Sequence, residues 1–221
     1  DLKARPKPLL FGRVFNISPP QVNTSKLLYQ VHDGSVASIS IFDRGVALTP
    51  GVAHATYAAL VGASPTAGTF DTWLTGGLFR LGANPVGTIT CDVAQTASAA
   101  NHTAAQIIKS VCLMAGVAAA QISSADVAAL DAAQAGEMGV WIDTEMRALD
   151  VVNEIKASAG AFVATDMTGV LRMGLLMPPA VPSVATLSES SVYSLDINAS
   201  DDTDRGIPSY RVKLRYKKNY T

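Results

Sequence analysis

The chain has 221 residues with 17 Lys and Arg against 18 Asp and Glu, which gives a net charge of −1 and a pI near 6.3. Hydrophobic residues make up 48% and charged residues 16%, a composition that excludes a globally disordered chain. It also excludes a basic nucleic-acid-binding domain, and no apolar run approaches the ~20 residues of a membrane-spanning helix.

The first fifty residues predict a meander of antiparallel strands. Asp33-Gly34 is typical of a two-residue hairpin, and Asp43-Arg44-Gly45 indicates a further turn. Strands are expected over Leu9–Ile17, Lys26–His32, Val36–Phe42 and Val46–Thr49. The following Val52–Val61 is rich in alanine but lacks a clear cap, so both a short helix and a loop stay open.

The stretch Gly68–Val93 predicts three more strands, separated by Gly76-Gly77 and by Ala83-Asn84-Pro85. They are expected over Thr69–Leu74, Leu78–Leu81 and Gly87–Val93. Trp73, Phe79 and Leu81 are expected to be buried, in the core or between subunits.

After Val93 the composition changes, and three helices are predicted. The first follows a Thr103 cap and ends before Gly116, with the apolar positions Ile107, Ile108, Val111, Cys112 and Ala115. The second follows Ser123 or Ser124, with Val127, Ala128 and Leu130 as its apolar face. After Gly136 and a brief strand at Val140–Ile142, the third runs from a Thr144 cap to Ser158, with Met146, Leu149, Val152 and Ile155 on one face and Gly160 as its stop.

The last part of the chain predicts strands again. A hairpin is expected from Ala161–Thr165 and Val170–Leu175 around Asp166-Met167-Thr168-Gly169. Later strands are expected over Val184–Leu187, Val192–Ile197 and Tyr210–Tyr220. The predicted fold is therefore α+β, with a β region over 1–93, a helical region over 94–160 and a second β region over 161–221. Because the chain starts at Asp1 and ends directly after a strand pattern, we expect a piece of a longer polypeptide.

Candidate chemistry in the sequence is sparse. The histidines His32, His54 and His102 stand in different elements, and we expect ordinary polar or half-buried roles for them. Cys91 and Cys112 are expected to be buried free thiols rather than a disulfide. No GxSxG, HExxH, CxxC or Walker loop is present, and Gly76-Gly77 continues into a strand rather than into a phosphate-binding helix. We expect no catalytic, cofactor or metal site and no enzyme.

Two charged segments near the end have alternative interpretations. The turn Asp201-Asp202-Thr203-Asp204 offers oxygen ligands but lacks the loop and the bidentate Glu of an EF-hand, which favours a solvated turn. The last strand alternates apolar residues with cations, and its cations are Arg211, Lys213, Arg215 and Lys217. They indicate a solvated edge whose like charges prevent pairing with other strands. An alternative is docking onto an acidic neighbour, such as this acidic turn in an adjacent subunit. Binding to nucleic acid ranks third.

Several segments together resemble tail proteins at the tail tip or baseplate hub of long-tailed bacteriophages and prophages. They are KPLLFGRVFNISP, LLYQVHDGSVASISIFDRG, GTFDTWLTGGLFRLGANPVGTITCDV and YRVKLRYKKNYT, with TAAQIIKSVCLMAG, VWIDTEMRALDVVNEIKASAG and FVATDMTGVLRMG in the same order between them. The resemblance covers nearly the whole chain but rests on pattern and order, and the alanine-rich middle departs from it.

This resemblance implies a structural virion protein, made in the bacterial host cytoplasm. It would build a ring, usually a trimer, between the tail tube, the tape-measure protein and the host-recognition parts. The resemblance carries over no catalytic residue. An alternative from another class is a cell-surface module that binds or cleaves glycans, which would need stacked aromatics or paired carboxylates; the chain offers only Glu137, Glu145, Glu154 and Glu189. A secreted or periplasmic adhesin is a third interpretation.

Overall fold

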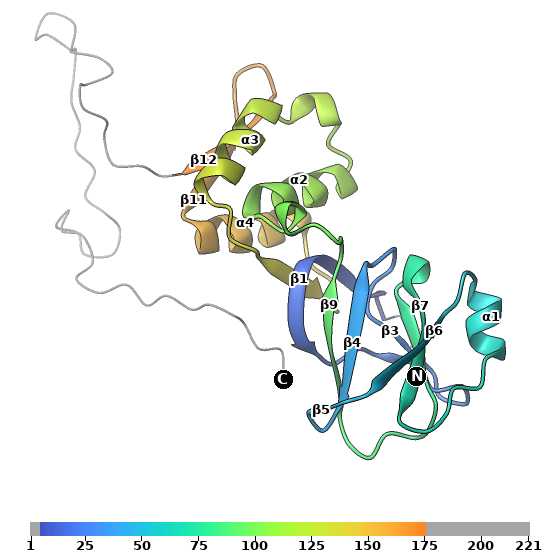
Figure 1. Ribbon diagram of the computed structural model, residues 1–221. Coiled ribbons are helices and arrows are strands. Elements are labelled where there is room, and N and C mark those ends of the chain that lie inside the picture. The colour runs from blue at the N-terminus through green and yellow to red at the C-terminus, as the bar shows by residue number, and fades with distance from the viewer. Residues whose placement is uncertain (1–4, 176–221) are drawn as a thin grey trace, which may run out of the picture. The chain divides into compact units, whose positions relative to one another are not determined.

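The computed structural model describes residues 5–175 (Figure 1). These residues form two five-stranded sheets, a two-stranded sheet and four α-helices. The fold is therefore α+β, and antiparallel pairing on both sides of the helical middle confirms the predicted class. The strands expected over Val184–Leu187, Val192–Ile197 and Tyr210–Tyr220 and the acidic turn lie outside the described residues.

The first sheet has the strand order β10-β1-β9-β4-β5, with antiparallel pairing throughout. Its strands are β1 (Leu9–Ile17), β4 (Ser38–Asp43), β5 (Val46–Ala47), β9 (Ile89–Ala94) and β10 (Gly139–Ile142). The second sheet has the order β2-β3-β8-β7-β6, and its β6–β7 pair is parallel. Its strands are β2 (Gln21–Asn23), β3 (Leu28–Gln30), β6 (Thr49–Ala53), β7 (Thr69–Trp73) and β8 (Leu78–Leu81).

The helices are α1 (Tyr57–Gly62), α2 (Ala104–Met114), α3 (Ser124–Ala133) and α4 (Ala148–Ala159). The predicted caps of the middle two are confirmed, because the Thr103 hydroxyl accepts from the Gln106 N–H and the Ser123 hydroxyl from the Asp126 N–H. The hairpin of β11 (Ala161–Thr165) and β12 (Leu171–Leu175) is also as predicted.

The two large sheets pack face to face around one core. Ile39 and Ile41 enter it from the first sheet, and Phe70, Phe79 and Leu81 enter it from the second. Tyr29 stacks on Phe79 with ring centroids 5.1 Å apart and planes 5° apart. Phe79 and Leu81 are thus buried as predicted, whereas Trp73 is only half-buried, beside α1 and the smaller cluster of Leu28, Leu60 and Leu78.

The helices and the β11–β12 hairpin enclose a second core. Ile107, Ile108 and Val111 contribute from α2, Val127 and Leu130 from α3. The hairpin contributes Met173, and α3 packs on β12 while α4 packs on β11 (Figure 1). The residues of this core are smaller than those of the sandwich, which suits close packing of short helices.

Strands β1 and β10 belong to both cores. In their antiparallel register Leu10 faces Trp141 and Phe11 faces Val140. Leu10 and Trp141 pack in the sandwich core, while Phe11 and Val140 pack in the helical core, because successive strand residues point to opposite faces. The sheet thus includes a strand from the expected helical region 94–160.

The predicted hairpin at Asp33-Gly34 is wrong, and the first fifty residues do not form a single meander. The strands on either side of this dipeptide enter different sheets, β3 the second and β4 the first. Around it the chain is held by distant segments: the Asp33 N–H donates to the Pro8 carbonyl at 2.7 Å, and the Val36 N–H to the Leu74 carbonyl at 2.9 Å. Non-local pairing has overridden a strong local turn signal.

The start of the third predicted helix is also wrong. Helix α4 begins at Ala148 after Arg147, and neither Thr144 nor Arg147 provides a side-chain cap. Met146 and Leu149, expected on its buried face, are 43% and 66% exposed. The buried face is formed instead by Val151, Val152, Ile155 and Ala159, while the predicted stop at Gly160 is confirmed by its left-handed φ of 63°.

Candidate assembly surface

His32 is a structural histidine in the sandwich. Its ring is buried, and Nδ1 accepts the Leu10 N–H at 3.0 Å, which ties the chain after β3 to β1. Burial lowers the pKa of His32, with a smaller opposing effect of Asp33, and so favours the neutral ring that this hydrogen bond needs.

His102 lies elsewhere, just before α2. Its Nε2 is 3.0 Å from the Thr96 hydroxyl, and its Nδ1 is 3.4 Å from Oε1 of Glu137, whose Oε2 is 3.5 Å from Nη1 of Arg13. The ring thus lies between Thr96, ahead of α2, and Glu137, ahead of β10. In residues 5–175, no three His, Cys, Asp or Glu side chains gather as metal ligands.

The two cysteines are free and buried, as predicted. Cys91 lies in the sandwich core and Cys112 in the helical core. Burial raises the pKa of both thiols, and Asp92 adds to the effect at Cys91. Both side chains thus behave as small apolar core residues. None of the helices in this part of the chain is long and apolar enough to cross a membrane.

The most unusual surface was not identified from the sequence. Residues 45–70 contain no Asp, Glu, Lys or Arg, although charged residues make up 16% of the chain. Within this run, residues 45–59 are exposed except for the half-buried Leu48 and His54. Val46 and Val52 are 68% and 60% exposed. We call residues 45–59 the β5–β6 surface.

The β5–β6 surface lies at the edges of both large sheets. Strand β5 is the outer strand of the first sheet and β6 that of the second, with Leu48 between them. Solvated edges are usually protected by Lys, Pro or a bulge. Here Pro50 and a bulge between Pro50 and Ala53 interrupt the backbone, but no charge is present. This edge therefore disfavours strand addition and leaves apolar side chains open to packing.

A buried carboxylate holds β6 from behind. Asp71 on β7 is 5% exposed; its Oδ1 accepts the Val52 N–H at 2.8 Å, and its Oδ2 lies 2.9 Å from Nε2 of His54. The His54 N–H donates to the Thr72 carbonyl at 2.7 Å. Gly51 is required beside this carboxylate, since a Cβ there would overlap Oδ1 of Asp71.

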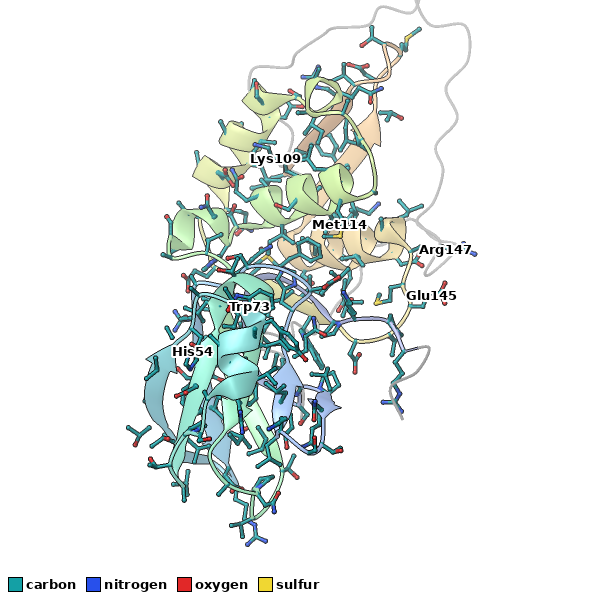
Figure 2. The ribbon with its side chains drawn as sticks, turned by 90° about the vertical axis from the view of Figure 1, so that its right-hand side faces the viewer. His54, Trp73, Lys109, Met114, Glu145 and Arg147 are labelled. Atoms are coloured by element: carbon teal, nitrogen blue, oxygen red, sulfur yellow. The ribbon has the colours of Figure 1, made fainter. Side chains whose placement is uncertain are left out.

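Helix α1 fixes the other end of the surface. The Thr56 hydroxyl caps it by accepting the Ala59 N–H at 3.2 Å, a cap that we did not recognise in the sequence. Arg80 donates from Nη1 to the carbonyls of Leu60 and Val61 at the end of the helix. Tyr57 of α1 contacts Trp73 with ring centroids 5.9 Å apart, and Trp73 and His54 flank the short helix in Figure 2.

The arrangement offers an ordered apolar surface rather than a set of reacting groups. Its histidine, His54, is turned to Asp71, and its exposed members are Val, Ala, Thr, Tyr, Gly and Pro. The absence of charge over residues 45–70 was the sequence signal that could have identified it. No family model, no curated protein and no solved structure matches this chain.

Proposed function

We propose that this chain is a structural component of a bacteriophage or prophage tail. It would form part of the tail tip or baseplate hub, which joins the tail tube to the host-recognition parts. The resemblance of its segments, in order, to such tail proteins supports the proposal. In this role the chain works by assembly in the virion, with copies of itself and with tube and tape-measure proteins, and catalyses no reaction.

The observation that carries the proposal is the β5–β6 surface. A solvated edge is protected by charge, Pro or a bulge, and this one has a Pro and a bulge but no charge; the centres of protein interfaces are likewise depleted in charge. Val46 and Val52 are largely exposed here, and full burial of a valine stabilises by about 1.5–3 kcal/mol. Covering both side chains would supply a substantial part of a subunit contact.

We further propose that the partner is another copy of this chain, with a trimer as the favoured state. In a closed ring of three, each contact joins two different faces, so the β5–β6 surface of one copy packs against another face of its neighbour. The near-neutral charge of the chain is compatible with self-association, because long-range repulsion between copies is small.

The test is the mass of the full chain in solution, measured by light scattering over a concentration series. The wild type should approach three times the monomer mass of 23.0 kDa. Val52→Lys should weaken association by about ten-fold or more, since it places a charge in the contact. A wild type that stays monomeric at its highest soluble concentration would contradict self-assembly.

The matched control is Leu149→Lys on α4. Leu149 is 66% exposed, close to the 60% of Val52, but lies outside the β5–β6 surface. It should leave the mass unchanged, and thermal unfolding should show that both variants remain folded. Equal loss of association in both variants would show that the contact is assigned to the wrong surface. Genes for tail-tube and tape-measure proteins beside the gene for this chain would independently support the tail assignment.

A further inference from the structure

We infer that Asp71 and His54 form a clamp that sets the shape of the β5–β6 surface before a partner copy binds. The inference rests on the proposed function and names two positioning residues for it. Neither would need to touch the partner; both would act through β6, which presents Val52.

The bulge creates the need for this clamp. Thr49 and Pro50 are in register with Thr69 and Phe70, but the next paired residue on β6 is Ala53, opposite Thr72. The extra residue on β6 moves the Val52 N–H out of the backbone ladder. The Asp71 carboxylate takes the place of the missing carbonyl and accepts this N–H at 2.8 Å.

His54 closes the clamp on the far side of Val52. Its main chain is hydrogen-bonded to Thr72, and its ring is hydrogen-bonded to the same carboxylate as the Val52 N–H. Val52 is thus held between attachment points on both sides, while its own side chain stays 60% exposed. A strand held in this way loses little conformational freedom when a partner covers it, which favours association.

The position of the charge supports a role in assembly. A buried carboxylate is unfavourable unless its oxygens are hydrogen-bonded, and an edge could be protected more simply by a Lys on its exposed side. In this chain the carboxylate lies behind the strand at 5% exposure, and the exposed side carries no charge. The clamp therefore fixes the edge while keeping it suitable for apolar contact.

The test uses the full chain with Asp71→Ala, His54→Ala and His54→Gln. Hydrogen exchange of the Val52 amide reports the clamp, and light scattering reports association. Asp71→Ala and His54→Ala should speed exchange at Val52 by about ten-fold or more and weaken association by a similar factor, because each removes one side of the clamp. His54→Gln should restore both, because its side-chain N–H₂ can still donate to Asp71.

Asp166→Ala is the matched control, since Asp166 also braces a loop by accepting backbone N–H groups, those of Thr168 and Val170, but in the β11–β12 hairpin. It should change neither exchange at Val52 nor association. If the clamp variants leave Val52 exchange or association at the wild-type level, the inference is overturned. The same holds if they speed exchange throughout the sandwich and weaken association only through unfolding. A monomeric wild type would instead refute the proposed function itself, so failure of the clamp and failure of the proposed function give different results.

Discussion

The β5–β6 surface and the β11–β12 hairpin both place strands at the surface, but they differ in where their charged groups lie. In the hairpin, Arg172 forms two hydrogen bonds with Asp126, at 2.6 and 3.1 Å, and lies 3.7 Å from Asp166. In the β5–β6 surface, residues 45–59 include no Asp, Glu, Lys or Arg, and the Asp71 carboxylate that binds β6 is buried behind the strand. Exposure alone therefore does not distinguish a solvated edge from a contact surface.

The comparison teaches that the position of charge is the better guide. The hairpin shows its ion pairs to water, and its two exposed large apolar residues are apart from each other, Met167 at the tip and Phe162 near the other end, opposite Gly174. Single exposed apolar residues of this kind are common on soluble proteins. Under the proposed function, the hairpin faces water and the β5–β6 surface faces a protein partner. Four experiments could break or sharpen this contrast.

The largest effect is expected from the cores beneath the two regions. Phe79→Ala removes a fully buried ring that stacks on Tyr29 and should cost about 3–5 kcal/mol of the free energy of unfolding. Phe162→Ala in the hairpin removes a ring that is 41% exposed and should cost less than about 1 kcal/mol. Denaturant unfolding measures both. An unchanged midpoint for Phe79→Ala would show that the sandwich does not depend on this core.

The next effect is a pH dependence that belongs to the sandwich. Burial lowers the pKa of His32 below 6.5, so the unfolded chain takes up this proton at a higher pH than the folded chain. Stability should be complete above pH 6.5 and should fall as the pH drops from there toward the folded-state pKa. His32→Asn, which can still accept the Leu10 N–H, should flatten this part of a curve of Tm against pH. An identical slope in both proteins would exclude His32 as its source.

A smaller pH dependence is expected in the hairpin. The hydrogen bonds from Arg172, followed by the bond from Ser123 and others, lower the pKa of Asp126 below its usual 3.8. This contribution to stability is present above pH 3.8 and is lost as the pH falls through the folded-state pKa. Asp126→Asn should lower Tm only slightly at neutral pH, since exposed ion pairs contribute little, and it should reduce the loss of Tm as the pH falls below 3.8. If the variant is as stable as the wild type at neutral pH, the Arg172–Asp126 ion pair does not contribute to stability.

The smallest effect is expected at the hairpin tip. Met167 is fully exposed, so Met167→Lys should change neither Tm nor the mass of the assembly. Light scattering beside Val52→Lys gives the direct contrast. Loss of association in Met167→Lys would show that the hairpin is also a contact surface, and the contrast drawn from charge would then fail.

Helix caps and turn residues in the sequence correctly predicted where helix α2 and the β11–β12 hairpin begin and end. Thr103 and Gly116 bound α2, and the β11–β12 hairpin forms around its expected turn, because caps and turns act over a few residues. Asp33-Gly34 failed because its flanking strands pair with partners far along the chain, which a local motif does not report.

The start of α4 and the candidate surface were missed for a related reason. The apolar residues Met146 and Leu149 satisfied a helical period, but burial depends on which face the other helices and the hairpin cover. The β5–β6 surface was missed because sequence motifs report the presence of reactive or charged groups, whereas its signal is the absence of Asp, Glu, Lys and Arg over residues 45–70.

The antiparallel pair of β1 and β10 has a consequence for the order in which the two cores can fold during synthesis. Trp141 fills the sandwich core and donates from Nε1 to the Val31 carbonyl at 3.0 Å, yet the ribosome makes it only after α2 and α3. Residues 9–12 of β1 therefore lack their partner strand β10 until residue 142 has emerged, and the sandwich core cannot be completed before then. Folding of the sandwich is in this way delayed until the helical segments that share β1 are also available to fold.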